Sequence, residues 1–138
     1  MSDVLKVAVL GVGSLGQHHA KHYAGLAREG VVDFVGLYDA DPARAKTIAA
    51  KYDVPVLASV EAAMDAAEAV NVVTPTITHF DLTSQLLRAG HHVLVEKPMT
   101  NTTAQAAELV KLARENKCVL QVGHIERFNP VFDYLQNV

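Results

Sequence analysis

The sequence predicts an α/β fold in which six parallel strands form one doubly wound sheet with helices on both faces. Short apolar runs alternate with segments of helical period, which is typical of parallel strands joined by crossover helices. The 138 residues match one domain of ordinary size with a single core. A glycine-rich turn follows the first apolar run, as it does in sheets of this kind that bind nucleotides.

The strands are predicted from composition and the helices from their end signals. The glycine motif at residues 11–16 opens a helix that runs to about Glu29. Asp41 can cap the next helix, with Pro42 at its first position. We place strands near Val4–Leu10, Asp33–Tyr38, Val54–Leu57, Ala69–Thr74, His92–Glu96 and Cys118–Val122.

Two further helices complete the alternation. Residues 77–89 have helical character, and Gly90 stands where a helix usually stops in a left-handed conformation. Thr102 followed by Gln105 predicts a capping box at the start of a helix that ends near Asn116. Residues 131–138 have the character of a helix that is cut short. One domain therefore fills residues 1–138, with no internal repeat or linker.

Composition excludes several classes of function. Half the residues are apolar, 20% are charged and the net charge is −3, so no basic stripe is available for nucleic acid. The single cysteine, Cys118, can form neither an intramolecular disulfide nor a thiolate zinc site. His18 and His22 have a metal-binding spacing but no third ligand, so we expect no metal. The absence of a long apolar run or a leader predicts a cytoplasmic protein that does not bind membranes.

The first predicted strand ends in a complete G-x-G-x-x-G motif. Gly11 permits the tight turn, Gly13 lets the backbone approach a diphosphate, and Gly16 lets the helix pack close to the strand. Ser14 and Leu15 lie between the last two glycines, at the start of the helix, where free amides and a partial positive charge attract phosphate. The motif and its context predict a Rossmann-type dinucleotide site.

An acidic residue at the end of the second strand favours NAD as the dinucleotide. Asp39 can accept hydrogen bonds from the adenosine ribose hydroxyls and would repel the 2′-phosphate of NADP. Asp41 is an alternative ribose ligand, although its place before Pro42 favours a helix cap. Arg44 leaves NADP open, because a nearby guanidinium could tolerate the phosphate or stack on adenine.

Polar residues follow the later strands, at the edge where ligands of open α/β sheets bind. Two interpretations of the charged pair Glu96 and Lys97 stay open at this stage: a ligand-binding pair, or a solvated strand end. Pro98 supports the first, because a bond before proline can be cis and can aim the preceding side chain. His19 lies near an apolar helix stripe, and we expect it to be packed and hydrogen-bonded. The other residues at this edge are Thr74, Pro75, His79, His124, Arg127 and Asn129.

Taken together, the motifs resemble the N-terminal domain of the Gfo/Idh/MocA oxidoreductases, over essentially the whole chain. The matching pieces are Gly11–Gly16, residues 38–41 with Arg44, Thr74-Pro75 with His79, and Glu96-Lys97-Pro98. The resemblance implies that the bond before Pro98 is cis. It also implies an NAD-dependent enzyme acting on a hydroxyl carbon of a sugar, nucleotide-sugar or cyclitol.

The resemblance also implies roles for the residues at this edge. Lys97 would be the catalytic residue, hydrogen-bonding the substrate hydroxyl or supporting its proton relay beside the nicotinamide. Glu96 would order the nicotinamide ribose region. The residues that would line the cofactor are Thr74, Pro75 and His79. Those that would contact the substrate are His124, Arg127 and Asn129.

Such enzymes take their proton-handling Asp and His from a second domain, which is absent from these 138 residues. We therefore expect this chain to bind cofactor and to be catalytically incomplete. We expect a homo-oligomer for the full-length parent, and the sequence does not indicate the oligomeric state of this fragment. The alternatives are a free-standing dinucleotide-binding sensor or docking module, and a degenerate domain that binds no cofactor.

Overall fold

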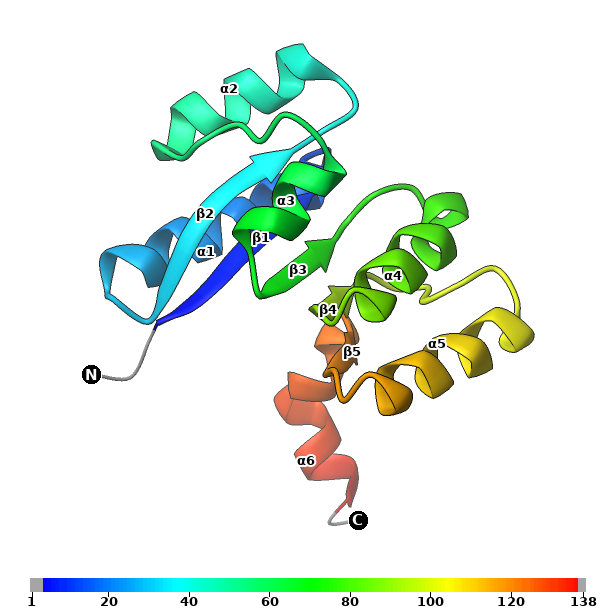
Figure 1. Ribbon diagram of the computed structural model, residues 1–138. Helices are drawn as coiled ribbons and strands as arrows, with labels where there is room; N and C mark the ends of the chain where they lie inside the picture. Colours follow the sequence, from blue (N-terminus) through cyan, green and yellow to red (C-terminus); the bar gives the residue numbers. More distant parts are fainter. Residues whose placement is uncertain (1–3, 137–138) are drawn as a thin grey trace.

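The computed structural model describes residues 4–136, and within them five parallel strands form one sheet (Figure 1). The predicted alternation of strands and helices is confirmed. The elements are β1 (Leu5–Leu10), α1 (Gly16–Arg28), β2 (Val32–Tyr38), α2 (Pro42–Tyr52), α3 (Val60–Ala66), β3 (Ala69–Val72), the 3₁₀ helix η1 (Thr76–Thr78), α4 (His79–Arg88), β4 (His92–Val95), α5 (Thr103–Glu115), β5 (Leu120–Val122), the 3₁₀ helix η2 (Ile125–Phe128) and α6 (Pro130–Gln136).

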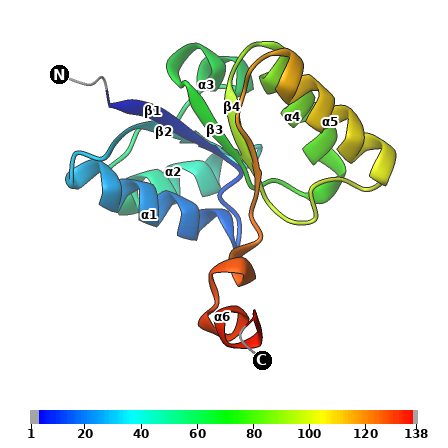
Figure 2. The same cartoon turned by 90° about the horizontal axis from the view of Figure 1, so that it is seen from below.

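The sheet has the strand order β2-β1-β3-β4-β5, and every pair is parallel. The chain leaves β1 toward β2 and then crosses back to add β3, β4 and β5 on the other side. Helices α1 and α2 cover one face, and α3, α4 and α5 cover the other (Figure 2). The order of the strands therefore reverses at β1 and β3, where ligands of such sheets bind.

Strand β1 shows how the two layers share the core. Val7 and Val9 pack into the cluster formed with α1 and α2, while Ala8 and Leu10 pack into the cluster under α4 and α5. All four side chains are buried. A strand buried on both faces needs a continuous apolar run, and that run made β1 predictable from sequence.

The predicted helix ends are confirmed by their hydrogen bonds. The side chain of Asp41 accepts from the amides of Ala43 and Arg44 at 3.0 and 3.2 Å, and Pro42 follows it. Gly90 ends α4 with φ +91°. At α5, only half of the predicted capping box forms.

The Thr102 hydroxyl accepts from the amide of Gln105 at 3.2 Å, which caps α5. The reciprocal bond is missing, because the side-chain oxygen of Gln105 is buried without a partner in the part of the chain that the structure describes. The last helix, α6, covers Pro130–Gln136, and the final two residues of the predicted helix lie outside the described range.

The sixth predicted strand, Val54–Leu57, is wrong. This segment makes only an isolated bridge to β2, between Val56 and Leu37. The amide of Leu37 donates to Pro55 at 3.0 Å, and the amide of Leu57 donates back to Leu37 at 2.8 Å. Pro55 has no N–H of its own, and a proline inside an apolar run limits the run to an edge contact.

The last strand is also shorter than predicted, since β5 begins at Leu120 rather than Cys118. The amide of Val119 donates to a side chain, Nδ1 of His92, at 2.9 Å. None of the helices between residues 4 and 136 is long and apolar enough to cross a bilayer.

Candidate functional site at the carboxyl edge of the sheet

The turn between β1 and α1 is built around two glycines that admit no side chain. Gly11 has φ +84°, its amide donates to the carbonyl of Tyr38 at 2.8 Å, and a Cβ on it would lie 2.7 Å from the Val73 carbonyl oxygen. A Cβ on Gly16 would overlap the carbonyl oxygen of Gly11. Both positions therefore need glycine because neighbouring backbone occupies the space.

Gly13 differs, because a Cβ there would meet no atom within 4 Å. The fold therefore does not require glycine at this position, and the open space beside it can admit a ligand. Within the described residues, no side chain caps the start of α1 and its first turn holds no acidic residue. Ser14 and Leu15 are exposed at the tip of the turn. Open space beside an uncapped helix start fits a diphosphate group.

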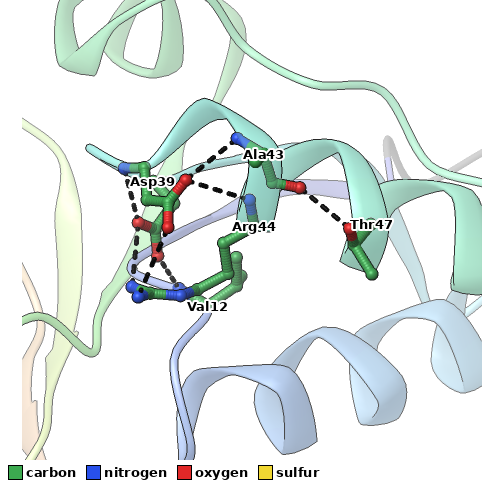
Figure 3. A network of polar contacts seen from close by, with 6 residues as sticks. Val12, Asp39, Ala43, Arg44 and Thr47 are labelled. Atoms are coloured by element: carbon green, nitrogen blue, oxygen red, sulfur yellow. Dashed lines mark hydrogen bonds and ion pairs between the residues drawn. The ribbon is translucent and has the colours of Figure 1, made fainter.

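Asp39 ties the end of β2 to this glycine turn (Figure 3). Its side chain is buried, and Oδ2 accepts from the amide of Val12 at 2.8 Å. Oδ1 accepts from the amide of Asp41 at 2.9 Å and from Nη1 of Arg44 at 3.3 Å. Arg44 also pairs with Asp41, at 3.5 Å. The alternative of Asp41 as the acidic ligand is weakened by its position as the cap of α2.

A groove of about 690 Å³ opens beside Asp39 and the glycine turn. Gly13, Asp39 and Arg44 line one part of it, and the apolar wall includes Pro75 and Leu82. Its size is that of a small-molecule site. A second hollow, of about 540 Å³, lies at the opposite end of the strands. We assign the site to the first groove, since ligands of open parallel sheets bind at the carboxyl ends of the strands.

Thr74 and Pro75, two of the three residues expected to line the cofactor, border this groove, but His79 does not. His79 is only 1% exposed. Its ring nitrogens lie 2.8 Å from the carbonyl oxygen of Thr74 and 2.9 Å from that of Pro98. The first turn of α4 places His79 beneath the site, where it joins the loop after β3 to the loop after β4. His79 is therefore buried away from this groove, and its expected part in lining the cofactor stays a prediction.

Glu96 lies at the end of β4 and is 4% exposed. Its Oε1 is 3.0 Å from Nε2 of His19, and its Oε2 accepts from the amide of Lys97 at 3.0 Å. Asn71 contacts Nδ1 of the same histidine at 2.9 Å. The prediction of a hydrogen-bonded His19 is confirmed, and the interpretation of Glu96 as part of a solvated strand end is wrong.

Two members of this cluster, Asn71 and Tyr23, were not predicted from the sequence. Asn71 is the one polar residue of the apolar strand β3, and that exception was the available signal. The hydroxyl of Tyr23 donates to Oδ1 of Asn71 at 3.0 Å. Burial raises the pKa of Tyr23 above its ordinary value, and the hydrogen bond to Asn71 partly offsets this.

Lys97 points its charge toward solvent. The bond between Lys97 and Pro98 is cis, as the resemblance implied. The side chain is exposed, and within residues 4–136 its amine makes no hydrogen bond or ion pair. An ammonium group at the carboxyl edge is thus free to bind a ligand.

The three expected substrate residues lie together but away from the groove at Asp39. His124 and Arg127 border a separate hollow of about 570 Å³ beside β5. The side chain of Asn129 contacts Glu126 at 3.0 Å and accepts from the amide of Val131 at 3.1 Å, so it starts α6. All three side chains are exposed. Nowhere in residues 4–136 do three His, Cys, Asp or Glu side chains gather as metal ligands would.

Comparison with known proteins decides the family. The profile of the Gfo/Idh/MocA oxidoreductases, described as an NAD-binding Rossmann fold, matches residues 5–124. The chain belongs to the Gfo/Idh/MocA oxidoreductase family. The resemblance found in the sequence is therefore confirmed, and the five-stranded sheet is the NAD-binding Rossmann fold of this family.

Two curated relatives illustrate the family. A UDP-N-acetylglucosamine 3-dehydrogenase of Acidithiobacillus ferrooxidans is 38% identical over 132 residues, 96% of this chain and 41% of its own length. An inositol 2-dehydrogenase of Rhizobium meliloti is 36% identical over 130 residues, 93% of this chain and 38% of its own. The chain thus spans about two fifths of the relatives it matches.

Solved structures agree with the fold. The Acidithiobacillus ferrooxidans dehydrogenase superposes with a TM-score of 0.88 at 37% identity, over 97% of this chain and 43% of that one. GenD2 from gentamicin A biosynthesis, solved in complex with NAD, superposes with a TM-score of 0.80 at 34% identity, over 89% of this chain and 35% of its own.

Proposed function

We propose that this chain binds NAD along the carboxyl edge of its sheet, as the cofactor-binding part of an oxidoreductase acting on a hydroxyl carbon. The observation that carries the proposal is the open space at Gly13, beside an uncapped helix start and the groove at Asp39. The adenosine half would occupy the groove and the diphosphate the glycine turn. The nicotinamide half would then extend toward the ends of β4 and β5.

Charge at the groove supports NAD over NADP. A 2′-phosphate on the adenosine ribose would approach the buried carboxylate of Asp39. Arg44, the nearest cation, already pairs with Asp39 at 3.3 Å and with Asp41 at 3.5 Å. A phosphate would have to draw the guanidinium from both carboxylates, so NADP should bind less tightly than NAD.

Lys97 is our candidate for contact with the substrate. Its exposed amine stands at the same edge as the site proposed for the nicotinamide, and as an ammonium it can donate a hydrogen bond to a substrate hydroxyl. When bound, NAD supplies the hydride-accepting ring, and the protein supplies orientation and charge. His124, Arg127 and Asn129 are exposed on the neighbouring segment and would contact the rest of the substrate.

The names of the relatives support a sugar-like substrate, because one acts on UDP-N-acetylglucosamine and another on inositol. We propose a sugar, nucleotide-sugar or cyclitol for the parent enzyme. Since the chain spans about two fifths of these relatives, the proposal for residues 1–138 themselves is cofactor binding.

Calorimetric titration of the chain with NAD and with NADP tests this proposal. We expect NAD to bind with a Kd below about 1 mM, which corresponds to roughly 4 kcal/mol, and NADP to bind more weakly. Binding of neither dinucleotide would overturn the proposal. Tighter binding of NADP would overturn the role given to Asp39 and Arg44.

A further inference from the structure

A continuous chain of hydrogen bonds leads from helix α1 through the sheet to the end of β4. The Tyr23 hydroxyl donates to Oδ1 of Asn71 at 3.0 Å, and Nδ2 of Asn71 lies 2.9 Å from Nδ1 of His19. Nε2 of His19 lies 3.0 Å from Oε1 of Glu96. The amide of Lys97 donates to Oε2 of Glu96 at 3.0 Å. Every donor in this chain meets an acceptor.

These contacts define where the hydrogens lie. In the orientation that places Oδ1 of Asn71 beside the Tyr23 hydroxyl, the Nδ2 group of Asn71 donates, so Nδ1 of His19 accepts. The hydrogen of a neutral imidazole is then on Nε2, directed at Glu96. The Glu96 carboxylate receives this bond and the bond from the Lys97 amide. The arrangement is satisfied with His19 neutral and Glu96 ionised, which leaves one net negative charge.

No Lys or Arg side chain among the described residues compensates this charge. Glu96 is 4% exposed, and no Lys or Arg in residues 4–136 comes within ion-pair distance of it. Gly123 covers the carboxylate closely, since a Cβ there would lie 2.6 Å from Oε1. The ammonium of Lys97 is exposed, so water and salt screen it far more than they screen the buried carboxylate.

The strand order places Glu96 on the nicotinamide side of the proposed site. Asp39 follows β2, the glycine turn follows β1, and Glu96 follows β4, two strands beyond β1 in the other direction. Neighbouring strands are about 4.8 Å apart, so β4 lies roughly 10 Å from β1. A dinucleotide with its adenosine at Asp39 and its diphosphate at Gly13 must extend its other half toward Glu96.

We propose that the buried carboxylate of Glu96 biases this site toward the oxidised cofactor, with His19 as the positioning residue that hydrogen-bonds the carboxylate. The nicotinamide ring of NAD⁺ is positive and that of NADH is neutral. A fixed negative charge in a poorly screened place therefore stabilises NAD⁺ relative to NADH. This inference rests on the proposed function, because it needs a site that binds both forms.

The substitution Glu96→Gln removes the charge and keeps the shape. The new amide can still accept from Lys97 and can donate to His19, provided that the histidine hydrogen moves from Nε2 to Nδ1 and the Asn71 amide turns over. Tyr23 permits this reversal because its hydroxyl both donates and accepts. The variant therefore has a satisfied arrangement available and should fold.

The test compares dissociation constants for NAD⁺ and NADH in the wild-type chain, in Glu96→Gln and in Glu68→Gln. Glu68 is the matched control: it also accepts a main-chain hydrogen bond, from Lys6 at 3.0 Å, but it is exposed at the opposite end of the sheet. We expect Glu96→Gln to raise the ratio of the NAD⁺ Kd to the NADH Kd at least about threefold. The Glu68→Gln ratio should match that of the wild type.

An unchanged ratio in Glu96→Gln, with both cofactors still bound, would overturn this inference and leave NAD binding intact. Failure of the wild-type chain to bind either cofactor would overturn the proposed function instead. Nitrogen-15 spectra of the His19 ring near neutral pH give a second readout that needs no cofactor. We expect a hydrogen on Nε2 alone, and hydrogens on both nitrogens would overturn the inference.

Discussion

The Asp39 carboxylate accepts a hydrogen bond from the main-chain amide of Val12 at 2.8 Å, although the two residues are 27 positions apart. This bond connects the end of β2 to the glycine turn after β1. The acidic residue and the turn are therefore one structure before any ligand arrives. Substitutions at Asp39 should affect the stability of the turn and the binding of the cofactor together.

We predict that Asp39→Ala lowers the free energy of unfolding by about 1–3 kcal/mol, because the buried amide of Val12 loses its acceptor. The same variant should weaken NAD binding and narrow the gap between NAD and NADP. Urea unfolding and calorimetry measure the two effects. Asp65→Ala, at an exposed position on α3, is the control and should change the stability by less than about 0.5 kcal/mol. An Asp39→Ala chain with unaltered cofactor preference would remove Asp39 from the site.

Substitutions at two glycines of the turn should affect different properties: one should lower stability and the other should weaken NAD binding. Gly16→Ala should destabilise the chain by about 3 kcal/mol, because its Cβ would overlap the Gly11 carbonyl. In Gly13→Ala the added Cβ meets no atom within 4 Å, so the free energy of unfolding should lie within about 1 kcal/mol of the wild-type value. This variant should nevertheless lose most of its affinity for NAD, since the methyl group fills the space proposed for the diphosphate. Thermal unfolding and calorimetry check both variants, and normal NAD binding by Gly13→Ala would contradict the assignment.

His79 should act as a link between two loops. We expect His79→Leu to cost about 2 kcal/mol of unfolding free energy, because a buried carbonyl of Thr74 or Pro98 loses its donor. Amide hydrogen exchange should speed up in both loops. His18→Leu, at an exposed position on α1, should leave exchange in these loops unchanged. Faster exchange in only one loop would show that His79 does not join them.

Cys118 should react slowly with thiol reagents. Burial raises the pKa of its thiol above the ordinary value, so less of the reactive thiolate is present at a given pH. By linkage, the unfolded chain loses this proton first, so the contribution to stability is complete below the ordinary thiol pKa and is lost as the pH rises through the folded value. Alkylation rates across a pH series measure the shift against a free thiol. If the alkylation rate of Cys118 rises at the same pH as that of a free thiol, or at a lower pH, the predicted pKa shift is contradicted.

Local chemistry made much of the fold predictable from sequence. The cap of α2 depends on Asp41 and Pro42, which are adjacent, and β1 depends on an unbroken apolar run. Segment 54–57 is as apolar as a strand, but Pro55 has no main-chain N–H to donate to β2, which limits its pairing. A prediction based on apolar composition alone does not take this missing donor into account.

The positions of the candidate-site residues were predictable where a local motif contains them and unpredictable where residues distant in the sequence meet. The glycine turn, Asp39 and Thr74 lie where the sequence places them. The contact of His19 with Glu96 spans 77 positions, and that with Asn71 spans 52. No local pattern encodes such pairs, although a lone asparagine in an apolar strand indicates a buried polar partner.

Amide chemical-shift mapping during titration of the chain with NAD would show directly whether the cofactor binds at the carboxyl edge of the sheet. We expect the largest changes at Gly13, Asp39 and Thr74, with further changes at Glu96 and Lys97. The opposite end of the sheet, at Lys6 and Glu68, should stay unchanged. Changes confined to that opposite end, or no changes at millimolar NAD, would contradict a cofactor site at the carboxyl edge.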